Sequence, residues 1–408
     1  MNILLINHYA GSFEHGRVYR SFYLAREWVK LGHTVTIVAA SWTHLRYRQP
    51  EMVKNIQEDH VEGVRFIWLK TPKYQGNGIK RAINIFAFVA QLFRYSNSLI
   101  KQVRPDIVIN TSYPLDTYPA QYIAKKAKAK LIHEVRDLWP LSLVELGTIS
   151  PFNPFIILMQ LAENSAYRHA DRVVSLLPQA EDHMRLHGLS AGKFVWIPNG
   201  ISLDEWKMDN VALPEPHQTT LDRAKQAGLF TVGYAGAHDL ANSLSTVLET
   251  AFLLQNQPIA FILVGQGSQK AYLQQKSLEL GLKNIIFLDS ISKSCIPSLL
   301  RQMDSLLIVW QKLSIYRFGI SPNKIMDYMM AAKPIIHSNS AGNDPVAEND
   351  CGISVPAEDA SLLANAIERL MNMSALEHAE MGRKGQKYVM NNHDYSVLAE
   401  KYLQIMKK

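Results

Sequence analysis

Short apolar runs of strand length alternate with helical patterns along almost the whole chain, and this alternation constrains the fold most strongly. Buried strands that alternate with helices form parallel sheets covered on both faces, so we predict an α/β fold. The expected strands cover residues 3–7, 34–39, 64–69, 106–110, 130–134, 172–177 and 194–197, and then 230–234, 260–264, 284–288, 305–309 and 334–337.

The alternation is interrupted once, by a polar, proline-containing stretch that follows Gly200 and extends through Gln218. A chain of 408 residues, of which 47% are hydrophobic, can form two cores. We therefore predict two doubly wound, Rossmann-like domains, residues 1–200 and 201–394, that face a central cleft. The helical pattern over residues 395–408 predicts a C-terminal helix that packs back onto the first domain.

The chain carries a net charge of +7, and its basic residues are spread along its length. This excess suits an anionic partner, and charge alone leaves phospholipid, polyphosphate ligands and nucleic acid open. The two cysteines, Cys295 and Cys351, have no paired spacing, which fits a reducing compartment. We therefore expect a cytoplasmic protein.

An apolar stretch at residues 82–93 has basic neighbours in Lys80, Arg81 and Arg94. It is shorter than the ~20 residues that a membrane-spanning helix needs. It fits an amphipathic helix packed on a sheet or one that lies along a membrane surface. A cluster of four lysines follows, Lys125, Lys126, Lys128 and Lys130. Together these features predict peripheral attachment to the inner face of the cytoplasmic membrane.

The segment 321–329 has the pattern of a helix N-terminus that binds phosphate groups. Ser321 can cap the first turn, and Pro322 suits the first helical position. The unpaired amides there, including that of Asn323, carry the positive end of the helix dipole. Lys324 adds a full charge, and Asp327 follows about one turn later. The segment predicts a site for a diphosphate beside a ribose, and an ordinary capped helix is the alternative.

Several other candidate binding residues lie in loops that follow expected strands, where open α/β sheets bind ligands. They are Gly11, Gly16, Arg136, Asp137, Gly236, His238 and Gly265. The glycines allow the backbone to approach a ligand closely, although each also fits an ordinary turn. Together these residues predict one rim of binding loops.

Other chemistries find little support in the sequence. His183 and His187 have the spacing of a helical metal pair, but no third ligand is evident, so zinc is not expected. The chain has no Asp-x-Asp for a metal–diphosphate bridge, no Walker A loop and no Gly-x-Ser-x-Gly elbow. We therefore expect neither a metal nor a cofactor beyond a co-substrate.

A set of motifs along the chain agrees with one family. They are Ala25-Arg26-Glu27, Gly32-His33-Thr34-Val35, Glu134-Val135-Arg136-Asp137-Leu138-Trp139-Pro140, Ile197-Pro198-Asn199-Gly200, Gly233-Tyr234-Ala235-Gly236, the segment 321–329 and Lys333-Pro334. Over essentially its whole length the chain resembles a family 4 retaining glycosyltransferase of the GT-B fold. Within that family it resembles the bacterial branch of N-acetyl-fucosamine transferases of O-antigen synthesis.

The resemblance implies transfer of a sugar, N-acetylated or deoxy, from a UDP-sugar to a lipid-linked glycan, with no nucleic acid as partner. In this family an acid on the helix after the Gly-rich loop, here Asp327, binds the ribose. Gly319 replaces the first acid of the family's Glu-x7-Glu pair. Ala237 and Asn242 stand where relatives carry an arginine and a lysine that clamp the diphosphate. We therefore assign the neutralisation of the leaving diphosphate to Lys324.

Backbone amides around Ser321 and Asn323 are expected to assist, with Arg317 either assisting or facing solvent. In the first domain, Arg136-Asp137 replaces the family's His-Asp. Arg136 is expected to pair with an anionic ligand and Asp137 to orient the incoming hydroxyl, and a structural ion pair is the alternative. A nucleotide-sugar 2-epimerase and a non-catalytic nucleotide- or glycan-binding subunit are alternative functions on the same architecture.

Overall fold

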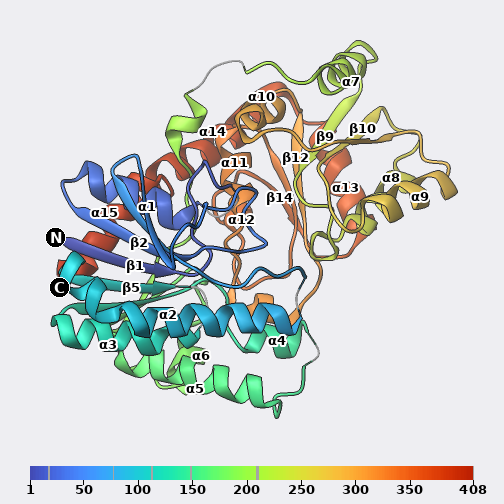
Figure 1. Cartoon of the computed structure of the whole chain (residues 1–408). Helices are drawn as coiled ribbons and strands as arrows, with labels where there is room; N and C mark the ends of the chain where they lie inside the picture. The colour runs from blue at the N-terminus through green and yellow to red at the C-terminus, as the bar shows by residue number, and fades with distance from the viewer. Residues whose placement is uncertain (17–18, 77, 112–113, 148, 208–210, 408) are drawn as a thin grey trace. The chain divides into compact units, whose positions relative to one another are not determined.

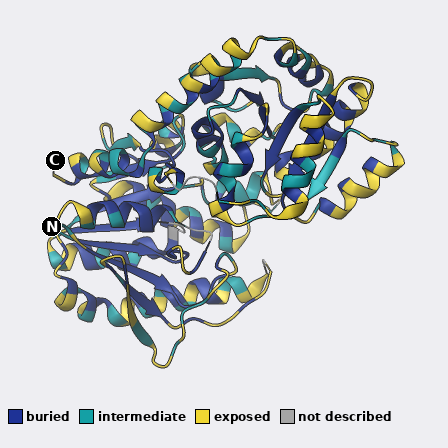
Figure 2. Cartoon of the chain, turned by 90° about the horizontal axis from the view of Figure 1, so that it is seen from above, coloured by how far each residue is buried: buried dark blue, intermediate teal, exposed yellow. Residues whose placement is uncertain are grey.

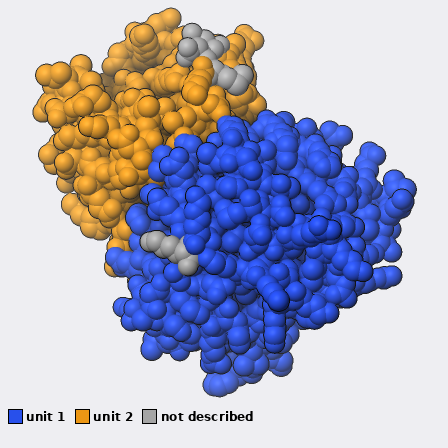
Figure 3. Space-filling model, turned by 90° about the vertical axis from the view of Figure 1, so that its left-hand side faces the viewer, with its two compact units in different colours: residues 1–199, 395–408 blue, residues 200–394 orange. Residues whose placement is uncertain are grey.

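The computed structural model describes residues 1–16, 19–76, 78–111, 114–147, 149–207 and 211–407. The chain divides into two compact units (Figure 3). Unit 1 contains residues 1–199 and 395–408, and unit 2 contains residues 200–394. Lys408, the last residue of the expected C-terminal helix, lies outside the described residues. The predicted α/β fold is confirmed, because each unit is built on a largely parallel sheet with helices on both faces.

Unit 1 has an eight-stranded sheet in the order β3-β4-β2-β1-β5-β6-β7-β8. Its strands are β1 Asn2–Asn7, β2 Thr34–Ala40, β3 Ile56–Val61, β4 Val64–Leu69, β5 Ile107–Thr111, β6 Lys130–Val135, β7 Arg172–Ser175 and β8 Phe194–Trp196. The strands pair in parallel except for β3, which runs antiparallel to β4 at the edge. The buried strands form the dark layer of each unit in Figure 2.

The helices of unit 1 are α1 Arg20–Lys30, α2 Ile79–Val103, α3 Thr117–Ala127, α4 Leu141–Glu145, α5 Pro154–His169, α6 Glu181–Leu186 and α15 Tyr395–Lys407. Helices α1 and α15 lie on one face of the sheet, and α2, α3 and α5 lie on the other (Figure 1). Successive residues of β1 point to opposite faces of the sheet, so they pack in turn into the hydrophobic cores on its two sides. Ile3 and Leu5 pack toward Trp28 of α1, whereas Leu4 and Ile6 pack toward Phe88 of α2.

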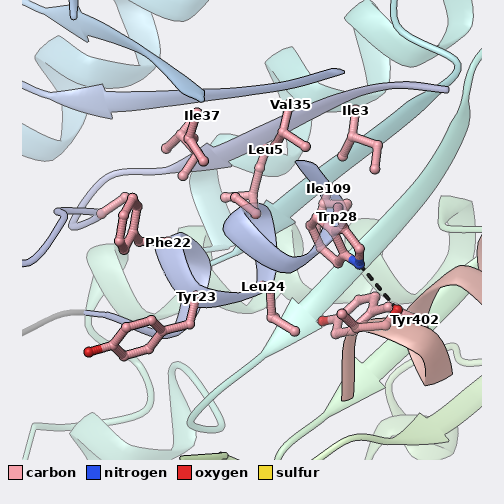
Figure 4. Packing of buried hydrophobic residues seen from close by; sticks show 14 of the residues in the cluster. Ile3, Leu5, Phe22, Tyr23, Leu24, Trp28, Val35, Ile37, Ile109 and Tyr402 are labelled. Atoms are coloured by element: carbon pink, nitrogen blue, oxygen red, sulfur yellow. Dashed lines mark hydrogen bonds between the residues drawn. The ribbon is translucent and has the colours of Figure 1, made fainter. Parts of the chain in front are cut away.

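A buried polar network fixes α15 to unit 1. Arg20 and Glu134 form an ion pair 3.1 Å long between side chains that are 2% and 4% exposed. The hydroxyl of Tyr402 donates a hydrogen bond to the same carboxylate. Trp28 packs edge-on against the Tyr402 ring, with ring centroids 5.4 Å apart (Figure 4), and its indole N–H donates to the Ala399 carbonyl at 3.1 Å.

Unit 2 has a six-stranded parallel sheet in the order β11-β10-β9-β12-β13-β14. Its strands are β9 Phe230–Ala235, β10 Ile259–Val264, β11 Ile285–Leu288, β12 Ser305–Val309, β13 Ile335–Ser338 and β14 Gly352–Val355. Its α-helices are α7 Glu215–Gln226, α8 Leu244–Leu253, α9 Lys270–Glu279, α10 Ile296–Arg301, α11 Asn323–Met330, α12 Pro345–Glu348, α13 Ala360–Met371 and α14 Ala375–Asn392. Leu306 of β12 packs toward α11, and its neighbour Leu307 packs toward α8 and α13.

All twelve expected strands are present, with ends that differ by at most two residues from those predicted. Two strands were missed, β3 and β14, and both lie at sheet edges. The centre of β3 is polar and exposed because the strand has one neighbour, so it lacks the apolar run of a central strand. Strand β14 has four residues, all half-buried, which is too short for a periodic pattern.

Candidate functional site

Four segments of unit 2 meet at the carboxyl ends of its parallel strands. They are residues 236–242 after β9, residues 265–267 after β10, Trp310 directly after β12, and Lys324 in the first turn of α11. Crossover connections between parallel strands bring such loops to one edge of a sheet. Contacts to Lys324 and between the two glycine loops join all four segments.

The amine of Lys324 lies in a box of neutral and aromatic groups. Its Nζ donates to the Tyr234 hydroxyl at 3.0 Å and to Oδ1 of Asn242 at 2.5 Å. The same atom lies 4.6 Å from the ring centroid of Tyr234 and 5.4 Å from that of Trp310. Burial lowers the pKa of Lys324 to about 7. Among the described residues, no carboxylate forms an ion pair with this amine.

This arrangement is notable because buried charges in proteins are normally paired with an opposite charge. The resemblance predicts that Asn242 replaces a lysine that clamps the diphosphate, and the Lys324 amine donates to Oδ1 of this residue. The amine of a lysine on α11 therefore lies beside residue 242, the position at which the resemblance predicts a diphosphate clamp. An anion is the natural partner of such a positive charge.

The start of α11 differs from the prediction by one residue. The helix begins at Asn323, and Pro322 occupies the N-cap position without a side-chain cap. The N-cap predicted at Ser321 is therefore shifted by one residue, and the extended backbone of Pro322 lies between this serine and the first helical residue. The amides of the first turn are not capped by the N-cap side chain, and Asn323 itself is exposed.

The loops after β9 and β10 pack backbone against backbone. Gly265 has a φ of +156°, and a Cβ there would lie 1.9 Å from the Gly236 carbonyl oxygen. A Cβ at Gly236 would lie 3.2 Å from Nζ of Lys324. Gly236 therefore keeps the space beside the lysine free of a side chain, and Gly265 allows the two loops to pack closely.

His238 is fully buried between these loops, and neither of its ring nitrogens has a partner among the described residues. Burial, with smaller effects of Lys270 and Lys324, lowers the pKa of His238 to about 4, so the ring is neutral at physiological pH. Because buried polar groups are nearly always hydrogen-bonded, this neutral imidazole is a candidate for a ligand contact. Lys270 itself bonds the Gly265 carbonyl at 3.0 Å and so supports the loop.

Asp327 lies on the same helix as Lys324 but has different partners. Its Oδ1 accepts a hydrogen bond from the Trp206 indole at 3.3 Å, and burial raises its pKa to about 6. Trp206 ends a short 3-10 helix, Leu203–Trp206, near the start of unit 2. Arg317 contacts its own turn, where it donates to the Ser314 carbonyl at 2.7 Å and stacks on Phe318 at 4.2 Å.

The predicted residues of unit 1 lie at the carboxyl ends of its strands. Arg136 and Asp137 follow β6, and these two residues form no ion pair with each other in the described structure. Arg136 is half-buried with an unpartnered Nε, whereas Asp137 is exposed. Gly11 packs against the Arg46 side chain, and Gly16 packs against the Tyr47 ring.

Three residues were not identified from the sequence: Arg46 lies beside Gly11 in unit 1, and Tyr234 and Trp310 lie beside Lys324 in unit 2. Arg46 is buried, donates to the Ala10 carbonyl at 3.1 Å and to the Ala40 carbonyl, and lies over the Trp68 ring. Tyr234 belongs to a motif that was recognised, and Trp310 directly follows an expected strand. The position of Trp310 after a strand was an available signal, whereas Tyr234 lies within β9. An aromatic residue in either place is ordinarily interpreted as part of the core.

Two family models match the chain, and together they span most of it. The model described as "Glycosyl transferase 4-like domain" matches residues 18–200, and "Glycosyl transferases group 1" matches residues 229–373. The chain therefore carries two glycosyltransferase domains. A similar protein is the "Putative colanic acid biosynthesis glycosyl transferase WcaI" of Escherichia coli (strain K12). It is 24% identical over 371 residues, which are 87% of this chain and 89% of that protein.

Solved structures show that this glycosyltransferase has the GT-B fold. Anabaena Alr3699/HepE in complex with UDP and glucose superposes with a TM-score of 0.69 at 15% identity, over 100% of both chains. WaaG, described as a glycosyltransferase involved in lipopolysaccharide biosynthesis, gives 0.67 at 13% identity over 99% of both chains. Sucrose-phosphate synthase from Thermosynechococcus elongatus gives 0.69 at 17% identity, over 99% of this chain and 98% of that one.

Two observations concern metals and membranes. Within the part of the chain that the structure describes, no three His, Cys, Asp or Glu side chains lie close enough together to hold a metal ion. The rings of His183 and His187 lie 4.5 Å apart without a third such group. None of the described helices combines the length and apolar character that crossing a bilayer requires.

Proposed function

We propose that this glycosyltransferase moves an N-acetylated or deoxy sugar from a UDP-sugar to a hydroxyl of a lipid-linked glycan, with retention of configuration and without a metal. The acceptor belongs to bacterial surface polysaccharide synthesis, such as O-antigen or capsule. The observation that carries the proposal is the buried amine of Lys324, which has neutral partners and no carboxylate in the described structure. A donor diphosphate supplies the missing anion.

The chemistry follows from where charge develops. As the glycosidic bond breaks, negative charge grows on the leaving diphosphate, and a fixed positive charge in a site with little water stabilises it strongly. Lys324 supplies that charge, and the first-turn amides of α11 add the positive end of the helix dipole. Neutral His238 offers a hydrogen bond to the same ligand.

Asp327 binds the ribose in this proposal. With a pKa of about 6 it is mostly ionised at neutral pH, and the Trp206 indole holds its Oδ1 in place. A carboxylate that is fixed in this way accepts well from a ribose hydroxyl. The choice of UDP is supported by the solved structure of HepE with UDP and glucose, and the polysaccharide role by the description of WcaI.

In unit 1, Asp137 orients the acceptor hydroxyl and Arg136 pairs with an anionic group of the acceptor or donor. The exposure of Asp137 and the unpartnered Nε of Arg136 support these roles, since neither group is committed to a structural ion pair with the other. Gly11 and Gly16, which lie against Arg46 and Tyr47, let the first loop of unit 1 approach the donor closely.

Release of free UDP tests the proposal. Purified protein should release UDP from a UDP-sugar when a lipid-linked glycan acceptor is present, and excess chelator should leave the rate unchanged because Lys324 replaces the metal. Release without acceptor, with a sugar altered at C2, indicates a 2-epimerase. Tight nucleotide binding without release indicates a non-catalytic subunit, and loss of turnover in chelator that magnesium restores contradicts the metal-free mechanism.

We propose that unit 1 attaches to the inner face of the cytoplasmic membrane through α2 and α5. Four large apolar side chains of α2 are exposed at helical spacing, Ile79, Ile83, Phe86 and Phe93. The exposed apolar side chains of α5 are Ile157, Leu158 and Leu161. Phe86 of α2 and Phe155 of α5 lie with ring centroids 6.4 Å apart, so the two helices join in one surface. The basic residues Lys80, Arg94 and Lys101 on α2 are also exposed and suit anionic lipid.

Replacing Ile83 and Phe86 together with serine should remove most of the binding to anionic vesicles at low salt, because the apolar contact is lost. A matched control is Leu278→Ser on α9 of unit 2, since Leu278 is 75% exposed but lies outside this surface. Neutralising Lys125, Lys126 and Lys128 should weaken vesicle binding at low salt and make the remaining binding less sensitive to salt. Lys130 is left intact because its amine donates to the Met406 carbonyl. Equal vesicle binding by all variants contradicts the surface.

A further inference from the structure

The loop 339–344, between β13 and α12, reaches the Lys324 site from two directions without lining it. Asn343 contacts the segment that leads into α11, and Asp344 contacts the β13 side chain that holds Trp310. Adjacent residues in one loop thus support both groups that offer positive charge to a diphosphate, the α11 amides and the Lys324 amine.

Asn343 holds Ile320 by two hydrogen bonds. Its Oδ1 accepts from the Ile320 amide at 2.7 Å, and its Nδ2 donates to the Ile320 carbonyl at 3.1 Å. The amide of Gly342 donates to the Tyr316 carbonyl at 2.9 Å. Because Ile320 lies three residues before α11, these bonds fix the entry of the chain into that helix.

A chain of hydrogen bonds joins Asp344 to Trp310 through His337. An indole N–H is only a donor, so Trp310 donates to Nε2 of His337 at 3.2 Å. The proton of the neutral His337 ring is then on Nδ1, which donates to Oδ1 of Asp344 at 2.9 Å. His337 is fully buried, and Asp344 also caps α12 by accepting from Val346 and Ala347.

These bonds fix the Trp310 indole in one orientation. Its ring centroid lies 5.4 Å from Nζ of Lys324, within the range of a cation–π contact. The indole therefore forms one wall of the box that confines the amine and keeps water from it.

We propose that Asn343, Asp344 and His337 are positioning residues of the donor site. They hold the Lys324 amine and the first turn of α11 in the relative positions that one diphosphate requires. The proposal rests on the proposed function, because the diphosphate is its ligand. Charge-stabilising groups need placement within about 0.5 Å, so a loosened Trp310 or Ile320 weakens the site without touching the ligand.

The test compares binding of UDP-glucose by calorimetry in matched variants. His337→Leu removes the acceptor for Trp310, whereas His337→Gln keeps one acceptor and one donor. Asn343→Leu frees Ile320. We expect His337→Leu and Asn343→Leu each to weaken binding about tenfold, and His337→Gln to recover most of it. The control is Asn284→Leu, which also removes a side-chain bond to a backbone carbonyl, that of Ala251, but away from the site. It should lower the melting temperature and leave the affinity within about twofold.

A second measurement is independent of the donor. The titration of Lys324 is followed by NMR of lysine labelled with ¹³C at Cε, in wild type and His337→Leu. The titratable groups that face the amine are Tyr234 of β9 and His238 in the following loop, and Trp310 and Asn242 are neutral. Burial is what depresses this pKa. Loosening Trp310 admits water, so the midpoint should rise by about half a unit or more.

The two measurements separate the possible failures. If wild type binds no nucleotide sugar, the proposed function is wrong while the lysine titration still reports on His337. If UDP-glucose affinity and the Lys324 midpoint both stay at wild-type values in a folded His337→Leu protein, the positioning role is overturned. The positioning role is also overturned if Asn284→Leu, at the same melting temperature as His337→Leu, loses as much affinity for UDP-glucose as that variant does.

Discussion

Replacing Lys324 with glutamine should lower kcat by roughly two to three orders of magnitude, the usual effect of removing one electrostatic stabiliser of a transition state. The amine faces charge that grows as the glycosidic bond breaks, so donor affinity should change less than turnover. The variant should melt no lower than wild type at neutral pH, because the empty site confines a buried amine whose pKa is lowered to about 7. An unchanged kcat in the folded variant ends the proposed role of Lys324.

Asp327→Asn is the matched comparison on the same helix. Bonds from a carboxylate to the ribose are the same in the ground state and the transition state, so their loss weakens binding and spares saturated turnover. We expect donor affinity to fall by about 1.5–3 kcal/mol, the range for a hydrogen bond to a charged group. Steady-state kinetics at saturating acceptor, paired with thermal melts, distinguishes the two patterns. Two variants with the same kinetic defect contradict the division of roles.

The pKa of Lys324 gives the first variant a further readout. A base whose folded pKa is lowered is charged below that pKa, so the empty site holds a charged amine below about pH 7 and a neutral one above it. A UDP-sugar has no phosphate group that titrates near neutrality, and only the charged amine pairs with it. Below about pH 6 the protonation of Asp327 should weaken donor binding. Above pH 7 the dissociation constant should rise by about tenfold for each unit, as the Lys324 amine loses its proton. Lys324→Gln should abolish this dependence.

Glu134→Leu should lower the free energy of unfolding of unit 1 by about 3–5 kcal/mol, the effect of removing one partner of a buried ion pair. It leaves the guanidinium of Arg20 buried without its counterion, and it removes the acceptor for the Tyr402 hydroxyl. Hydrogen exchange of amides in α1 and β6, read against amides of unit 2 in the same molecule, measures this loss for unit 1 alone.

The control for this variant is Glu181→Leu, which removes an exposed ion pair with Arg185 in the same unit. Exposed pairs contribute about 1 kcal/mol or less, so this change should leave exchange in α1 and β6 near wild type. Equal protection of these amides in Glu134→Leu and wild type shows that the network does not hold unit 1 together.

Much of the fold was predictable from the sequence, because both sheets are made of central parallel strands that are buried on both faces. Such strands appear as continuous apolar runs, whereas the edge strands β3 and β14 keep polar or short sequences and were missed. The start of α11 was misplaced by one residue because Pro322 suits either the N-cap or the first helical position, and only the backbone decides between them.

The candidate site was predictable in part. Lys324 was recognised because it is a charged residue at a predicted helix N-terminus. The loops that contain Gly236 and Gly265 were recognised because they follow predicted strands. The box around the amine was not, since Tyr234, Asn242 and Trp310 come from separate segments and their side chains meet only through tertiary packing. The hydrogen bond from Trp206 to Asp327 joins residues 121 positions apart, and no local sequence pattern predicts such a pair.

The return of α15 to unit 1 has a consequence for biosynthesis. The ribosome finishes unit 2 at Asp394 while unit 1 still lacks α15, one of the two described helices on one face of its sheet. Until Tyr402 emerges, the carboxylate of Glu134 lacks one of its donors and the Trp28 ring lacks its neighbour. The first segment to be synthesised is therefore the last to mature, and the nascent chain carries an exposed apolar surface throughout translation of the second unit.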